Sequence, residues 1–156
     1  MQSIPGAFGR GATALALVAA SLLLAAAPAR AQLRLDITQG VRDAVPIAVV
    51  PFGGQAEGAA TDVAAVIAND LRMSGRFAPL ERRDMVARPT AGPDIRYEDW
   101  RLLKSDFIVV GRVEPDGVSF ELHNVRTGAS LLVQRLPSSE KGVRATAHRI
   151  ADLVFE

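Results

Sequence analysis

Two short runs that are apolar at every position constrain this fold more than any other feature. They are Ile47-Ala48-Val49-Val50 and Phe107-Ile108-Val109-Val110. Side chains alternate between the two faces of a β-sheet, so a strand with no polar position must be covered on both faces. We therefore expect both runs to be central strands of a layered domain.

Between these runs, the period of the apolar residues changes from that of a strand to that of a helix. The residues at helical spacing are Val63, Val66, Ile67 and Leu71. Asp62 suits the positive end of this helix, and Gly75 stands where a left-handed C-cap is expected. A short strand over Phe77 to Leu80 follows. Strand, helix and strand predict a βαβ unit with parallel strands and a right-handed crossover.

The second half of the chain predicts an antiparallel extension of the sheet. Residues 82–94 are polar and contain two prolines, which indicates a loop, and residues 97–104 predict a short helix with Trp100 and Leu103 facing inward. Turns at 115–117 and 126–128 separate predicted strands over 118–124 and 130–136. The last helix has Val143, Ala147, Ile150 and Val154 on one stripe. The predicted fold of residues 46–156 is therefore α/β, with a mixed sheet, a parallel centre, an antiparallel meander and two long helices.

Residues 1–31 have the layout of a secretory signal peptide. Arg10 supplies the positive charge, residues 11–27 are small and apolar, and Ala29-Arg30-Ala31 after Pro28 matches a signal-peptidase site. Cleavage would leave Gln32 as the mature N-terminus. The alternative is a transmembrane anchor, but the apolar run is short for a span and has no basic stop-transfer cluster after it. We expect an exported chain with no membrane span after cleavage.

The charge balance of the mature chain argues against nucleic acid or an anionic membrane as a partner. The whole chain has 18 Lys and Arg against 17 Asp and Glu, and the leader contributes two of the basic residues, Arg10 and Arg30. The mature chain therefore carries a net charge of about −1 and has no excess of positive charge. Cysteine is absent, which excludes both disulfides and the acylated cysteine of a lipoprotein. We expect a soluble periplasmic or secreted domain that is stabilised by its core.

No set of residues in the sequence predicts catalysis, a cofactor site or a metal site. His123 shares a strand face with Ser119 and Glu121 and is expected to face solvent. His148 is expected on the exposed side of a helix, with Arg144 and Asp152 as charge partners one turn away. The glycines at 53, 54 and 58 lack the Gly-Lys-Ser/Thr of a phosphate loop and predict a flexible loop. We therefore expect a protein that is not an enzyme and has no cofactor.

The segment directly after the leader is the best candidate for binding. Residues 33–38 alternate, with Leu33, Leu35 and Ile37 on one side and Arg34, Asp36 and Thr38 on the other. This pattern predicts a strand about 20 Å long. Such a strand either completes the sheet of its own domain or adds to the sheet edge of another protein.

The order of several motifs resembles the N-terminal domain family of TolB, the periplasmic component of the Tol-Pal system. The matching stretches are Leu33 to Thr38 with Gly40-Val41, Pro46 to Phe52, Ala68 to Arg72 with Ser74 to Phe77, the region of Trp100, Val109 to Val113, and Ala147-His148 to Glu156. They follow the family order across nearly the whole mature chain.

This resemblance implies an α/β domain that precedes a six-bladed β-propeller. In the family, the mature N-terminal strand engages the C-terminal domain of TolA, and the propeller binds the lipoprotein Pal. Carried over by position, the TolA-binding residues are Leu33, Arg34, Leu35, Asp36, Ile37, Thr38, Gly40 and Val41. The implied function is that of a periplasmic adaptor, without a cofactor, that maintains outer-membrane integrity, assists outer-membrane invagination during cell division and is linked to protein import.

Two features set limits on this interpretation. The sequence ends at Glu156, within a helix and before any propeller, so we expect a fragment or the first domain of a longer protein, and Pal would bind only if a propeller follows. The alternative function is a periplasmic adaptor of another kind, one that activates cell-wall synthases or assembles secretion pores. Proteins of that kind share the strand-loop-helix core but are commonly anchored through a cysteine, which this chain lacks.

Overall fold

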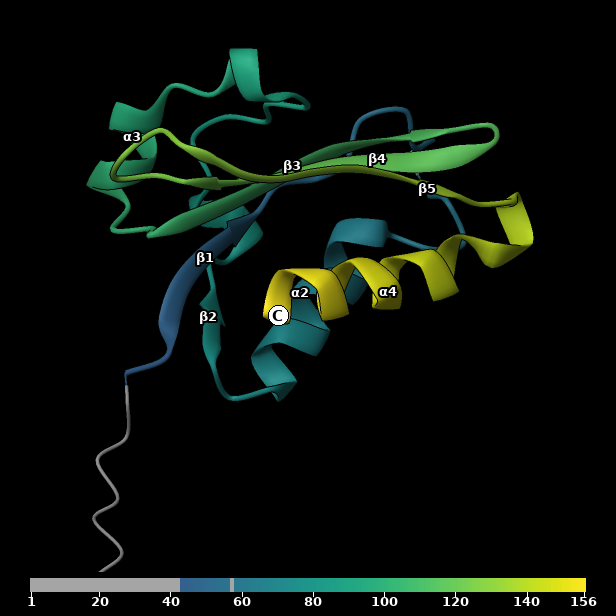
Figure 1. The fold of residues 1–156 in the computed structure, drawn as a ribbon, viewed down its shortest axis with the longest axis horizontal. Coiled ribbons are helices and arrows are strands. Elements are labelled where there is room, and N and C mark those ends of the chain that lie inside the picture. The colour runs from purple at the N-terminus through teal and green to yellow at the C-terminus, as the bar shows by residue number, and fades with distance from the viewer. Residues whose placement is uncertain (1–42, 57) are drawn as a thin grey trace, which may run out of the picture. The chain divides into compact units, whose positions relative to one another are not determined.

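The computed structural model describes residues 43–156, except residue 57, and it contains one mixed sheet with helices against it (Figure 1). The strands are β1 (Val45–Val49), β2 (Phe77–Pro79), β3 (Phe107–Glu114), β4 (Gly117–Asn124) and β5 (Ser130–Pro137). The α-helices of the described residues are α2 (Val63–Met73), α3 (Tyr97–Leu102) and α4 (Val143–Phe155), and short 3-10 helices occupy Arg82–Asp84, Gly92–Asp94 and Glu140–Gly142. The five strands lie in the order β2-β1-β3-β4-β5.

The register confirms the predicted mixture of parallel and antiparallel pairs. β1 pairs in parallel with β2, with Val45 opposite Phe77, and also with β3, with Ile47 opposite Phe107. β3, β4 and β5 then form an antiparallel meander, in which β4 pairs with both of its sequence neighbours. β1 is thus hydrogen-bonded along both of its edges.

The main core lies between the sheet and the two long helices, which cover the same face (Figure 1). Val49, Val109 and Phe120 supply the sheet side of this core. The predicted stripes of both helices supply the other side, with Ile67, Leu71, Ala147 and Ile150 at 0–1% exposure. Burial of this apolar area is the main term that stabilises the fold.

A second, smaller core covers the opposite face of the sheet (Figure 1). Ala48 of β1, Val50 directly after β1, and Ile108 and Val110 of β3 project into it. α3 and the segment before it form the cover, and Trp100 is fully buried there. The two all-apolar runs are therefore covered on both faces, as their sequences predict.

Asp62 begins α2 and also joins the helix to the cover of the second core. Its carboxylate accepts a hydrogen bond from the Ala65 N–H at 3.0 Å, and Arg82 Nη1 lies 2.7 Å from its Oδ2 atom. The hydrogen bond from Arg82 is the largest cause that lowers the pKa of Asp62 below its ordinary value of 3.8. Gly75, with φ at +70°, ends the helix as expected.

Replacing Asp62 with alanine is expected to lower the free energy of unfolding by about 1 kcal/mol at pH 7, because an N-cap and a surface ion pair are both lost. A depressed folded-state pKa gives stability above the unfolded value, and this stability disappears as pH falls through the folded-state pKa. The difference between wild type and variant in urea unfolding should therefore shrink below pH 3.8. Asp84→Ala is the matched control, since Asp84 approaches only Arg83, at 4.0 Å. A difference that stays constant down to pH 2 would contradict this assignment.

Candidate functional site: polar clusters and a terminal groove

The segment predicted to bind a partner, Leu33 to Thr38 with Gly40 and Val41, lies outside the described residues. The predicted leader and its cleavage site at Ala29, Ala31 and Gln32 also lie outside them. The described chain begins at exposed Asp43, and the N–H of Val45 donates to the Arg76 carbonyl at 2.9 Å where β1 starts. Only a few residues of sequence therefore separate the predicted segment from β1, an interior strand of the sheet.

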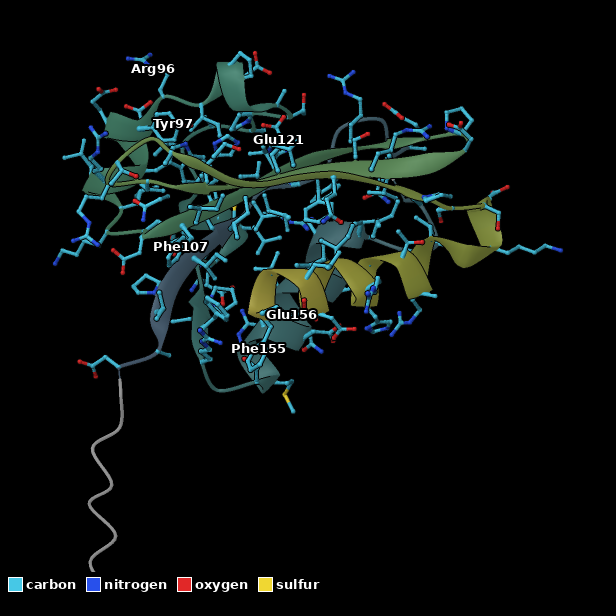
Figure 2. All side chains as sticks on the ribbon, in the orientation of Figure 1. Arg96, Tyr97, Phe107, Glu121, Phe155 and Glu156 are labelled. Carbon is cyan, nitrogen blue, oxygen red and sulfur yellow. The ribbon has the colours of Figure 1, made fainter. Side chains whose placement is uncertain are left out.

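The prediction that His123 faces solvent is wrong. His123 is only 4% exposed, because the segment before α3 covers this face of β4. Its Nε2 atom lies 2.8 Å from Glu121 Oε2, and its Nδ1 atom lies 3.1 Å from the Tyr97 hydroxyl (Figure 2 labels Tyr97 and Glu121). Glu121 Oε1 accepts a further hydrogen bond from the Gly92 N–H at 3.2 Å.

One neutral form of His123 satisfies this whole cluster. Its Nε2–H donates to Glu121, and its Nδ1 accepts from the Tyr97 O–H. Burial and the nearby Glu121 charge raise the pKa of Tyr97, which keeps the phenol protonated as a donor. Each polar group of the cluster already has a hydrogen-bond partner within it. These hydrogen bonds hold the segment before α3 against the sheet and leave no free ligand or nucleophile.

His148 is exposed as expected, but its partner differs from the predicted ones. Its side chain is 46% exposed, and its Nδ1 atom lies 2.5 Å from Asp70 Oδ2. Asp70 belongs to α2, whereas Arg144 and Asp152, the predicted partners, lie on the same helix as His148. The helical spacing predicts neighbours within α4 and carries no information on which helix packs beside it.

The described part of the chain offers no set of metal ligands. Among residues 43–56 and 58–156, no cluster of three or more His, Cys, Asp or Glu side chains could hold a metal ion. None of the helices in these residues has the length and apolar character needed to cross a membrane.

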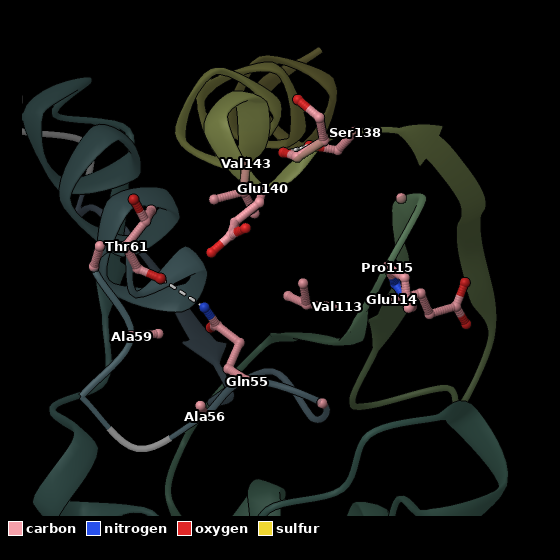
Figure 3. Close-up of a pocket in the computed structure, with 14 residues that line it drawn as sticks. Gln55, Ala56, Ala59, Thr61, Val113, Glu114, Pro115, Ser138, Glu140 and Val143 are labelled. Atoms are coloured by element: carbon pink, nitrogen blue, oxygen red, sulfur yellow. Dashed lines mark hydrogen bonds between the residues drawn. The ribbon is translucent and has the colours of Figure 1, made fainter.

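The glycine-containing loop after β1 forms one wall of a groove with a volume of about 530 Å³ (Figure 3). Gln55 holds this wall in place, because its Nε2 donates to the Thr61 carbonyl at 2.6 Å and its Oε1 accepts from the Val63 N–H at 3.2 Å. The end of β3 forms the floor, and the connection from β5 to α4 forms the other wall. The sequence gives no signal for this groove, because its walls meet only in the folded chain.

The fold and these sites define a small layered α/β domain whose buried polar groups are structural. The model of the TolB amino-terminal domain family matches residues 33–131. The chain belongs to this family. A TolB amino-terminal domain is a non-enzymatic adaptor domain, which confirms the expectation that the chain is not an enzyme.

Individual relatives agree with this assignment. The chain is 42% identical over 131 residues to the Tol-Pal system protein TolB of Nitrosococcus oceani, which covers 81% of this chain and 30% of that protein. It is 38% identical over 148 residues to the TolB of Xanthomonas euvesicatoria, covering 90% of this chain and 34% of that protein. The crystal structure of TolB from Acinetobacter baumannii is similar with a TM-score of 0.61 and 26% identity, over 72% of this chain and 27% of that chain. The chain thus spans about 30% of the length of the curated relatives it matches.

Proposed function

We propose that the chain is an exported adaptor of the Tol-Pal system that binds the C-terminal domain of TolA through residues 33–41. In this proposal, residues 1–31 are removed and the mature domain works in the periplasm, where it maintains outer-membrane integrity and assists outer-membrane invagination during division. The observation that carries the proposal is the family match, which begins at residue 33, directly after the predicted cleavage site.

The alternation of residues 33–38 supports strand addition as the way of binding. Backbone N–H and C=O groups of an added strand give affinity, and alternate side chains give selectivity. In this arrangement, Leu33, Leu35 and Ile37 share one face and would pack on the partner's core, while Arg34, Asp36 and Thr38 would face water. Pal binding is not proposed for this segment, since the resemblance assigns Pal to the propeller.

The proposal is tested by titrating the TolA C-terminal domain from the same genome into the mature chain, in an isothermal titration calorimeter. Deletion of residues 33–41 is expected to abolish the binding heat and to leave the circular dichroism of the domain unchanged. Unchanged affinity after the deletion would overturn the proposal.

A matched pair of variants tests the mode of binding. Leu35→Ser with Ile37→Ser should weaken binding by about 100-fold, since two buried aliphatic side chains are lost from the interface. Arg34→Ser with Thr38→Ser should change the affinity by less than about tenfold. Equal losses in both pairs would contradict a strand that presents one apolar face.

A further inference from the structure

The groove at the carboxyl ends of β1 and β3 has a composition that selects for a particular occupant. Its apolar lining comes from the loop after β1, the end of β3 and the start of α4, and consists of Ala56, Ala59, Ala60, Val113, Pro115 and Val143. A volume of about 530 Å³ is in the range of sites that enclose a short peptide or a drug-sized molecule. The groove is thus wide enough for a short extended segment.

Most polar atoms that line the groove already have partners. Gln55 uses both ends of its amide within the loop after β1. Ser138 Oγ accepts from Thr146 Oγ1 at 2.9 Å and donates to the Ser139 carbonyl at 3.1 Å. Glu114 Oε2 accepts from Arg135 Nε at 3.0 Å, and in Figure 3 its carboxylate points away from the groove. These groups stabilise the walls and are not available to a ligand.

Of the two charged side chains that line the groove, Glu114 and Glu140, only Glu140 is without a partner among the described residues. Its carboxylate points into the groove toward Gln55 and Thr61 in Figure 3. It takes part in no ion pair or hydrogen bond with the described residues, and no lysine or arginine is among the residues that line the groove. An exposed carboxylate beside an apolar wall, with no lysine or arginine in the lining, attracts a donor that carries positive charge.

We propose that this groove docks an extended protein segment in which one arginine, flanked by apolar residues, places its guanidinium on Glu140. The flanking residues would pack on the alanines, Val113 and Val143, and the planar guanidinium would donate to both carboxylate oxygens. The proposal goes beyond the function proposed above, because it requires neither residues 33–41 nor TolA. The two proposals can therefore fail independently.

The test uses three peptides and the isotope-labelled mature chain in two-dimensional NMR titrations. The peptides are acetyl-Val-Arg-Val-amide, acetyl-Val-Gln-Val-amide and acetyl-Val-Glu-Val-amide, each taken to millimolar concentration. We expect the arginine peptide to bind about tenfold more tightly than the glutamine peptide, because it adds a charge-assisted pair in a half-open site. The glutamate peptide should bind most weakly, and the shifted amides should be those of residues 54–56, 59–61, 113, 114, 117, 138–140 and 143.

Three variants make the result specific to the groove. Glu140→Gln should remove the preference for arginine, whereas Glu98→Gln, an exposed glutamate on α3, should keep it. Ala59→Leu, at an exposed position of the wall, should weaken the binding of all three peptides, because the larger side chain fills the groove. Equal binding of the arginine and glutamine peptides, shifts outside the groove, no binding at all, or a preference that survives Glu140→Gln would each overturn the proposal.

Discussion

Replacing Trp100 with alanine is expected to lower the free energy of unfolding by about 3–5 kcal/mol. Trp100 is fully buried, and its side chain fills the second core on the face of β1 and β3 that α3 covers. The strands beneath Trp100 are fixed by backbone pairing on both of their edges, so the cavity would not collapse fully. Because the chain contains a single tryptophan, unfolding in urea should be followed by far-ultraviolet circular dichroism instead of fluorescence.

Leu102→Ala is the control for this measurement. Leu102 lies on the same short helix but is 83% exposed, so its truncation should change the free energy of unfolding by less than about 0.5 kcal/mol. If the two variants were equally stable, the second core would not contribute as the structure indicates.

Replacing Gly111 with alanine is expected to destabilise the domain by about 2–3 kcal/mol, although it adds only one methyl group. Gly111 lies within β3, opposite Phe120. A Cβ atom there would lie 2.4 Å from Phe52 Cε1 and 2.5 Å from the Ser119 carbonyl oxygen. The ring is 5% exposed and the carbonyl belongs to the sheet, so neither can move away without loss. The midpoint and slope of urea unfolding measure the effect.

Measuring Gly111→Ala in a Phe52→Leu variant separates the clash with Phe52 from the clash with the Ser119 carbonyl. Phe52→Leu removes the Cε1 atom but leaves the Ser119 carbonyl in place, so the cost of Gly111→Ala should be smaller in Phe52→Leu than in wild type. An equal cost in both backgrounds would assign the whole effect to the carbonyl.

Much of the fold could be predicted from the sequence because its strongest patterns are local. The two all-apolar runs predict central strands with cover on both faces, and the structure confirms this. The apolar stripes of α2 and α4 and the turns of the meander follow from spacing and from glycine positions in the same way. The length of a strand depends less on its local sequence. β3 continues past the apolar run to Glu114, because pairing with β4 holds Gly111 and exposed Arg112 in the sheet.

The error at His123 shows where local patterns fail. Ser119, Glu121 and His123 form the polar side of an alternating strand, which normally faces water. However, His123 lies opposite Ile108 of β3 and therefore shares the face that the second core must cover. The covering segment reaches β4 as well, and the hydrogen bonds to Glu121 and Tyr97 compensate for the burial of the imidazole. A histidine paired with a strand that is apolar on both faces should have been expected under the same cover.

The candidate sites were predictable to different degrees. The alternating segment after the predicted leader could be found from its period and position alone, and its binding role stays a prediction. The groove could not be found, because Gln55, Val113 and Glu140 come from three distant segments that meet only through the sheet order. The His148–Asp70 pair between α4 and α2 was missed for the same reason.

The interior place of β1 in the sheet has a mechanical consequence. Tension that enters the described fold at Val45 pulls along the axis of a strand that is bonded to β2 on one side and to β3 on the other. Both rows of backbone hydrogen bonds then bear the load in shear at the same time, whereas an edge strand would have only one row to resist it. A load applied at Val45 therefore meets the sheet at an interior strand and not at an edge.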